Sequence, residues 1–119
     1  MRKKSDQELE KIAVQQAKNG DFVDAIKTAR RLRYFSDRAW VLADIVNIQI
    51  DNEDFDNALK TAEYIEDYKK DFALCRIAKA QAKNGDYDDA IKTAESIKIF
   101  DYKGLALYYI AKKRSIENE

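Results

Sequence analysis

Q-A-K-N-G-D-Y-D-D-A-I-K-T-A, at residues 81–94, decides the fold, because the chain contains one nearly identical copy of this string and one more divergent copy. The copies are Q-A-K-N-G-D-F-V-D-A-I-K-T-A at residues 16–29 and Q-I-D-N-E-D-F-D-N-A-L-K-T-A at residues 49–62, with offsets of 33 and then 32 residues. A period of that size is typical of a solenoid, in which each unit buries its apolar face by stacking on the next. The sequence therefore predicts one repeated structural unit.

The repeated string has the chemistry of a helix, a tight turn and a second helix. Gly20 and Gly85 stand where the first helix must stop, since Gly takes the left-handed C-terminal conformation at little cost. Glu53 replaces this Gly in the middle copy, which predicts a strained or differently shaped turn there. The residues expected to cap the second helices are Asp21, Asp54 and Asp86.

Small side chains mark the face on which the two helices of each unit are expected to meet. In the string that begins the second helix, two alanines stand four residues apart and therefore share one helix face. We expect the first alanine of each pair, Ala25, Ala58 and Ala90, to be buried where helices touch. The aromatic residues Phe22, Phe55 and Tyr87 are expected to fill the space beside them. Each unit is thus predicted to be a helical hairpin.

Extending this register along the chain predicts seven helices. They are expected over about residues 6–18, 22–33, 37–51, 55–66, 68–82 and 87–97, with a seventh after residue 101. The first should begin at Ser5, where S-D-Q-E forms a capping box with Glu8. The other expected starting residues are Ser36, Asp67 and Asp101.

Composition limits the class of protein. The chain has 119 residues, enough for one domain, and 22 basic and 22 acidic side chains give zero net charge. Residues 1–38 are mainly basic and residues 39–70 mainly acidic. No apolar run has the length of a membrane span, and the basic start leads into polar residues rather than an apolar signal core. Cys75 stands alone and is interpreted as a small core residue, so a cytoplasmic protein is expected.

The pattern resembles the tetratricopeptide repeat (TPR) family over nearly the whole chain. The residues that carry the resemblance are Gly20-Asp21-Phe22 with Ala25, Glu53-Asp54-Phe55 with Ala58, Gly85-Asp86-Tyr87 with Ala90, and the pairs Ile12-Ala13, Ile45-Val46, Ile77-Ala78 and Ile110-Ala111. The units are shorter than the family's roughly 34 residues, and the inter-repeat Pro is absent. The family's usual aromatic and small positions are also exchanged, with Ala29, Ala62 and Ala94 followed by Leu32, Ile65 and Ile97.

The resemblance implies a single domain over residues 1–119, folded as a right-handed α-solenoid. Its three helix-turn-helix repeats would cover about residues 6–38, 39–70 and 71–103, and residues 104–116 would form a capping helix. In this family, first-helix side chains line a concave groove that holds a peptide. The positions carried over to this chain are Trp40, Asn47, Phe72, Arg76, Lys79, Tyr108 and Lys112, with Gln7, Glu10 and Val14 in the first unit and Ala43, Ile50, Cys75 and Leu105 in the later ones.

The expected ligand of this groove is a protein or peptide segment with a hydrophobic anchor and a carboxylate. Trp, Tyr and Arg dominate the energetics of interfaces when they cluster, which favours such a site. Trp40 and Phe72 have an equally plausible role in packing between adjacent first helices. The chain is therefore expected to be a non-enzymatic interaction scaffold, either a monomer or a weak homo-oligomer.

Catalytic chemistry is not indicated. The chain contains no His, the usual general base at neutral pH, and its single Cys cannot form a metal-binding cluster. The carboxylates Asp86, Asp88 and Asp89 fall in a helix's first turn, where capping and the helix dipole explain them. We therefore expect no catalytic residues, no metal and no cofactor.

Arg30, Arg31 and Arg33 form the strongest cluster of like charge, with Arg38 nearby. One reading is an RNA-associated helical-repeat protein that contacts phosphates along this edge. The favoured reading is structural, because cations at a helix C-terminus interact well with the helix dipole and acidic residues follow in the next repeat. Nucleic acid and membranes are thus not expected as partners. A self-associating or designed structural repeat without a ligand is a further alternative.

Overall fold

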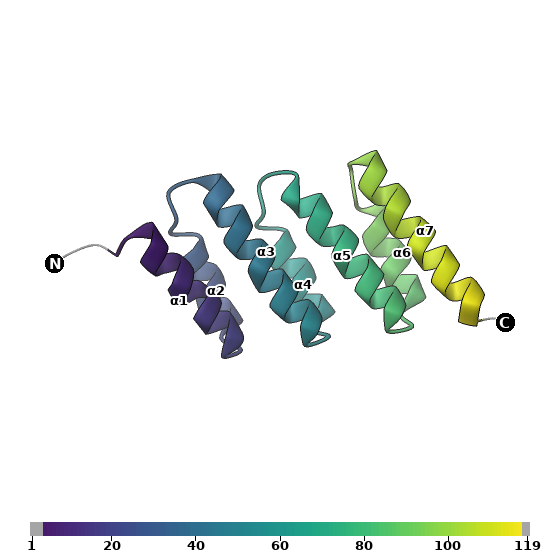
Figure 1. The fold of residues 1–119 in the computed structure, drawn as a ribbon, viewed down its shortest axis with the longest axis horizontal. Coiled ribbons are helices and arrows are strands. Elements are labelled where there is room, and N and C mark those ends of the chain that lie inside the picture. The colour runs from purple at the N-terminus through teal and green to yellow at the C-terminus, as the bar shows by residue number, and fades with distance from the viewer. Residues whose placement is uncertain (1–3, 118–119) are drawn as a thin grey trace. The chain divides into compact units, whose positions relative to one another are not determined.

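Seven helices and no strand make up residues 4–117, the part of the chain that this computed structural model describes (Figure 1). The helices are α1 (Asp6–Lys18), α2 (Phe22–Ala29), α3 (Phe35–Asp51), α4 (Phe55–Ala62), α5 (Lys69–Lys83), α6 (Tyr87–Glu95) and α7 (Phe100–Glu117). The prediction of seven helices is confirmed for these residues. Over the same range, every helix is too short or too polar to cross a membrane.

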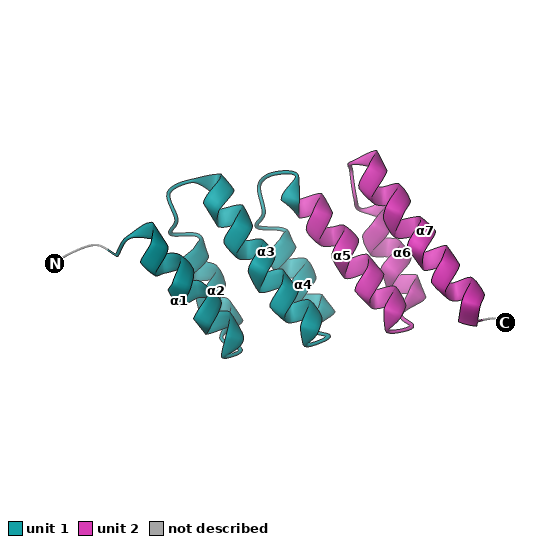
Figure 2. Ribbon diagram, in the orientation of Figure 1, with its two compact units in different colours: residues 1–69 teal, residues 70–119 magenta. Residues whose placement is uncertain are grey.

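The chain divides into two compact units, residues 1–69 and residues 70–119 (Figure 2). The division falls within one residue of the boundary predicted between the second and third repeats. In the first unit, α1 packs against α2, α3 packs against α4, and α3 also contacts both helices of the first hairpin. In the second unit, α6 packs against α7. Gln81 of α5 and Thr93 of α6 are joined by a hydrogen bond.

The alanines predicted to lie at helix contacts form the centre of each hairpin. Ala25, Ala58 and Ala90 are all 0% exposed, which confirms that the repeated string was assigned to the correct helix face. Large aliphatic residues of the first helices, such as Leu42, Ile45 and Ile77, are also fully buried. The aromatic residues that precede the alanines, Phe22, Phe55 and Tyr87, are half-buried.

The three tight turns share one hydrogen-bond pattern. Gly20 and Gly85 have φ of 85° and 87°, and Glu53 takes the same left-handed region with φ of 57°. In the middle turn, the amide of Glu53 donates to the Ile50 carbonyl at 2.9 Å and the amide of Asp54 to the Gln49 carbonyl at 2.9 Å, a Schellman arrangement that the glycine turns repeat. The middle turn therefore keeps its shape and carries the expected strain.

Replacing Glu53 with Gly should raise the free energy of unfolding by about 1 kcal/mol. A left-handed conformation costs a residue with a Cβ roughly 1–2 kcal/mol, and the greater freedom of Gly in the unfolded chain offsets part of the gain. Urea unfolding followed by far-UV circular dichroism measures the difference. Gly85→Ala is the matched control and should be destabilising, although no atom lies within 4 Å of the added Cβ. A loss of stability in Glu53→Gly would contradict the assignment of strain.

The starts of the helices agree only partly with the sequence. Ser5 caps α1 as predicted, with its hydroxyl 3.2 Å from the amide of Glu8. Asp21, Asp54 and Asp86 occupy the N-cap positions of α2, α4 and α6, but in this structure their side chains accept no capping hydrogen bond. Their ψ angles of 64–70° differ from the extended value of 161° at Ser5, so the carboxylates are not aimed at the first helix amides.

Three other predicted starting residues also need correction. Ser36 lies inside the first turn of α3, which begins at Phe35, and Asp101 lies inside the first turn of α7. Asp67 precedes α5 by one residue more than expected, and its carboxylate accepts from the amide of Lys69 at 2.9 Å. These errors are of one or two residues, the range within which helix ends fray and are hardest to place.

The second helices end earlier than predicted, at Ala29, Ala62 and Glu95. The chain then tightens into a 3₁₀-like turn, in which each amide donates to the carbonyl three residues before it. The amide of Leu32 donates to Ala29 at 3.1 Å, that of Ile65 to Ala62 at 3.0 Å and that of Ile97 to Ala94 at 3.1 Å. This tightening buries Leu32, Ile65 and Ile97, which a continued α-helix would direct elsewhere.

A threonine–glutamine hydrogen bond, part-buried in the first hairpin and buried in the third, joins the two helices in two of the three hairpins. Thr28 donates to the amide oxygen of Gln16 at 2.7 Å, and Thr93 donates to that of Gln81 at 2.7 Å. The middle hairpin has the same pair of residue types, yet Gln49 is fully buried and its side-chain amide has no hydrogen-bond partner within residues 4–117. Thr61 donates to the backbone carbonyl of Asn57 at 3.0 Å, as Thr28 and Thr93 also do to the carbonyls four residues before them, but it has no bond to Gln49. The α3–α4 hairpin therefore contains an unsatisfied amide that the others do not.

Candidate functional site

A groove runs between α1 and α3, the first helices of the two hairpins in the first unit. It has a volume of about 540 Å³. Its lining residues are Glu10, Lys11, Val14, Gln15 and Lys18 of α1 and Asp37, Trp40, Val41 and Asp44 of α3. The structure thus brings together Trp40, Glu10 and Val14, three of the residues that the sequence placed in a groove.

Trp40 is the most exposed large side chain in this groove, with 61% of its surface accessible. Lys69 approaches it from the start of α5, and the ammonium lies 4.9 Å from the Trp40 ring centroid and 4.6 Å from that of Tyr68. Asp67 holds the ammonium through a hydrogen bond of 2.9 Å, which raises the pKa of Lys69. The indole is therefore held next to a cation of its own chain while most of its surface is open to a ligand.

The charges along the groove are mixed, with carboxylates in excess. Glu10, Asp37 and Asp44 face two lysines, Lys11 and Lys18. Partial desolvation raises the pKa of the Asp44 carboxyl above its ordinary value. A cationic group of a ligand would relieve that cost, because a nearby positive charge favours the ionised carboxylate. Asn47, also predicted in the groove, lies half-buried on the same helix α3.

The second unit holds the other aromatic residues predicted to bind a ligand. Phe72 of α5 is partly exposed, and its ring packs edge-on against Tyr102 of α7 at a centroid distance of 5.8 Å. Tyr108 of α7 is exposed, and the Lys112 ammonium lies 5.9 Å from its ring centroid. Phe72 thus packs against another first helix, one of the two roles that the sequence left open, and keeps an accessible face.

Cationic side chains accompany these aromatic residues on α5. Arg76 is exposed, and the ammonium of Lys79 lies 5.8 Å from the Tyr109 ring centroid. Cys75 directly precedes Arg76 in sequence and is buried, which confirms its reading as a core residue. Burial raises the pKa of the Cys75 thiol, and the positive charge of Lys79 only partly opposes this shift. A buried, protonated thiol is a poor nucleophile.

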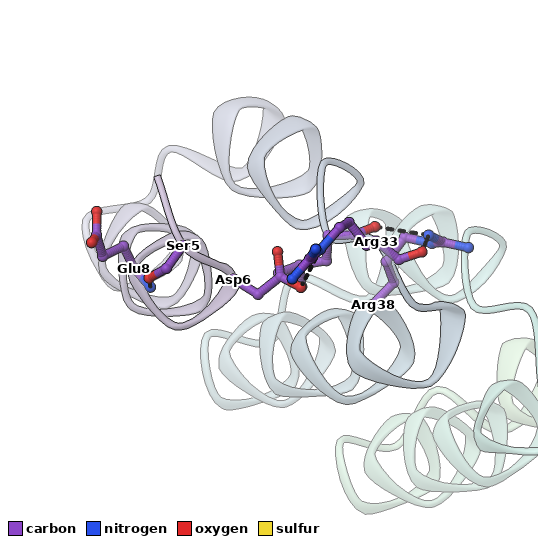
Figure 3. A network of polar contacts seen from close by, with 6 residues as sticks. Ser5, Asp6, Glu8, Arg33 and Arg38 are labelled. Carbon is purple, nitrogen blue, oxygen red and sulfur yellow. Dashed lines mark hydrogen bonds and ion pairs between the residues drawn. The ribbon is translucent and has the colours of Figure 1, made fainter. Parts of the chain in front are cut away.

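The arginine cluster takes part in contacts within the first unit (Figure 3). Arg33 donates to Asp6 at 3.3 Å, and the guanidinium of Arg30 lies 4.7 Å from the Tyr64 ring centroid. Arg38 donates to the Leu32 carbonyl at 2.8 Å, and its guanidinium lies 3.1 Å from the Glu66 carboxylate. These side chains connect the start of α1, the link between α2 and α3, and the link after α4.

Sequence reasoning missed Asp71, a buried carboxylate at the start of α5. Its oxygen accepts from the amides of Lys98 and Ile99 at 3.2 and 2.8 Å and so fixes the link between α6 and α7. Asp71 stands at the repeat position of Asp6, whose partner Arg33 is likewise the repeat equivalent of Lys98. The repeat register therefore held a signal for this structural contact.

Clusters of metal-ligating side chains were also searched for among the described residues. Within residues 4–117, no group of three or more His, Cys, Asp or Glu side chains is placed to hold a metal ion. Comparison of the chain with family models, curated proteins and solved structures gave no match. The candidate site is therefore defined by its own geometry, a groove of mixed charge that includes an exposed tryptophan.

Proposed function

We propose that the chain is a TPR-like interaction module without catalytic activity that binds a peptide segment along its first helices. The observation that carries the proposal is the groove between α1 and α3, into which the protein's only tryptophan presents an exposed ring. A concave site with an aromatic anchor and a few charged groups is typical of ligand recognition. The repeated hairpins with matching turns support the TPR-like assignment.

The proposal includes a right-handed solenoid arrangement of the repeats and residence in the cytoplasm. The period of 32–33 residues and the buried alanines at equivalent positions support the first point. The solitary, buried Cys75 is compatible with the second. The partner is proposed to be a protein segment rather than a small molecule, because the groove is open and polar at its edges.

The charges of the first unit favour a peptide that carries a basic residue. Its cation would lie close to Asp44, and its apolar or aromatic residue would lie against the exposed part of the Trp40 ring, whose cation–π partner is already the Lys69 ammonium of the chain itself. The cations suited to an acidic or carboxylate group of the partner, Arg76, Lys79 and Lys112, all belong to the second unit. We therefore expect the ligand of the α1–α3 groove to carry a basic residue together with an apolar or aromatic residue.

Titration of the full chain with an arrayed peptide library tests this function, because Trp40 provides an intrinsic fluorescent probe. Peptides that combine a basic and an apolar residue should shift the tryptophan emission to shorter wavelength as the ring leaves water. Asp44→Asn should weaken the binding of such peptides while leaving that of neutral peptides unchanged. Absence of any emission change across peptides of every charge class would contradict the proposed function.

The RNA-associated alternative has less support from the arginine contacts. Arg33 is paired with Asp6, the Arg30 guanidinium lies over the Tyr64 ring, and Arg38 donates a hydrogen bond to a backbone carbonyl. Phosphate binding would have to compete with these contacts, and the nearby carboxylates oppose an anion. We therefore do not propose nucleic acid as the ligand.

A further inference from the structure

Helix α7 repeats the register of the first helices α1, α3 and α5. Its pair Ile110-Ala111 follows Ile77-Ala78 by 33 residues, as Ile45-Val46 follows Ile12-Ala13. Ile110 and Ala106 are buried, as expected for a first helix that packs on the preceding hairpin. One side of α7 thus has the environment of its repeat equivalents.

The opposite side of α7, which carries Ala111, differs in burial from its repeat equivalents. In α1, α3 and α5 this side faces the second helix of the same hairpin, and Ala13, Val46 and Ala78 are each 0% exposed. In α7 the equivalent Ala111 is exposed. Ser115, one turn further along, is exposed as well, whereas its equivalents Ala17 and Ala82 are fully buried. Leu107 is half-buried, whereas Leu9, Leu42 and Leu74 are buried.

These residues line a groove of about 610 Å³ on the second unit, beside α6. Its lining residues are Ile91 of α6 and Leu107, Ile110, Ala111, Arg114 and Ser115 of α7. Apolar side chains predominate, and the guanidinium of Arg114 lies near one end, 5.6 Å from the Tyr87 ring centroid. The groove therefore has the apolar character of a face that a second helix covers in the other repeats.

The residue types of α2, α4 and α6, which cover the equivalent face in the other repeats, indicate which kind of helix would fit the groove beside α7. In α2, α4 and α6, alanines four residues apart allow the close approach, and Thr28 and Thr93 bond to Gln16 and Gln81. Arg114 stands at the repeat position of these glutamines. A glutamine oxygen accepts from a threonine, whereas a guanidinium only donates, so the matching position of a covering helix requires a carboxylate.

We propose that the α6–α7 groove binds, in trans, one short amphipathic helix of a partner protein. This helix would present alanines four residues apart to Ala111 and a Glu or Asp to Arg114. A second copy of the chain is a poorer occupant, because α2, α4 and α6 each bury their own alanines and are not free to be donated. The groove is separate from the α1–α3 groove of the proposed function, so either site can fail its test without the other.

A synthetic peptide based on α6 tests the proposal. The probe spans residues 86–98 with Thr93→Glu, and the target is the ¹⁵N-labelled full chain. We expect amide signals of Leu107, Ala111 and Arg114 to shift, with saturation below about 1 mM peptide. The unmodified peptide, which keeps the threonine, should bind several-fold more weakly.

Two variants make the test decisive. Ala111→Leu should fill the groove and abolish the shifts without lowering the melting temperature, because the site is exposed. The Arg114→Glu variant should no longer bind the Thr93→Glu peptide and should instead bind a peptide that carries Thr93→Lys. Absence of shifts up to about 1 mM, or shifts confined to α5, would overturn the proposal. So would a dimer of the free chain that Ala111→Leu dissociates, since a second copy would then fill the groove.

Discussion

Ala58→Leu should lower the free energy of unfolding by about 1–3 kcal/mol, because the added methylene groups overpack a fully closed helix contact. Ala58 is 0% exposed, and so are its equivalents Ala25 and Ala90. Leucine has nearly the same helix propensity as alanine, so the loss would reflect packing rather than the intrinsic preference of α4. Urea unfolding followed by far-UV circular dichroism measures the change.

The matched control is Lys60→Leu, an exposed position on the same helix. It introduces the same side chain without entering the contact and should change stability by less than about 0.5 kcal/mol. An unchanged slope of the unfolding curve with denaturant would show that the variant alters stability and not the extent of unfolding. Equal stability of Ala58→Leu and the parent chain would contradict the close approach of α3 and α4.

Trp40→Ala should weaken the binding of a peptide partner by about 2 kcal/mol, or roughly thirtyfold. An exposed aromatic ring beside an open groove supplies large apolar area at a small cost in side-chain entropy. Because this variant lacks the intrinsic probe, its affinity must be measured with a fluorescently labelled peptide by polarisation. The affinity of Trp40→Phe should lie between that of the parent chain and that of Trp40→Ala, since phenylalanine keeps an aromatic face but a smaller one.

Two comparisons separate binding from folding in this experiment. Lys60→Ala on α4 removes a side chain outside the α1–α3 groove and should leave the affinity unchanged. The melting temperature of Trp40→Ala should stay near that of the parent chain, since the exposed ring contributes mainly a contact with Lys69. Retained peptide affinity in a folded Trp40→Ala protein would show that the groove is not the binding site.

The parts of the fold that were predictable are those that depend on local sequence repeated at a fixed spacing. Gly20 and Gly85 stop the first helices wherever they occur, and Ala25 and Ala90 lie on the same helix face in each copy. One copy of the string would indicate its helices and turn only weakly. Three copies at a fixed spacing indicate the same register, so the prediction of helical hairpins was firm. Trp40 was placed in a groove by the resemblance to the TPR family, and it lines the groove between α1 and α3.

The parts that were not predictable depend on contacts between residues far apart in sequence or on exact backbone angles. Asp71 bonds to amides that follow it by 27 and 28 residues, a contact that no local pattern specifies. Lys69 finds its place between Trp40 and Tyr68 only after the hairpins have packed. Asp21 lies at the predicted position, but the ψ angle there aims its carboxylate away from the helix amides.

Two unfavourable features lie at the C-terminal end of α3, the unsatisfied side-chain amide of Gln49 and the left-handed backbone of Glu53. The backbone groups of both residues also take part in the hydrogen bonds of the turn that follows. Proteins open locally in cooperative segments, and the cost of each opening depends on what that segment gains from being closed. Opening this turn would hydrate the buried amide and relax the left-handed glutamate. Among the three repeated hairpins, local opening is therefore easiest at the α3–α4 turn. Its backbone amides should exchange their protons with solvent faster than those of the other two turns.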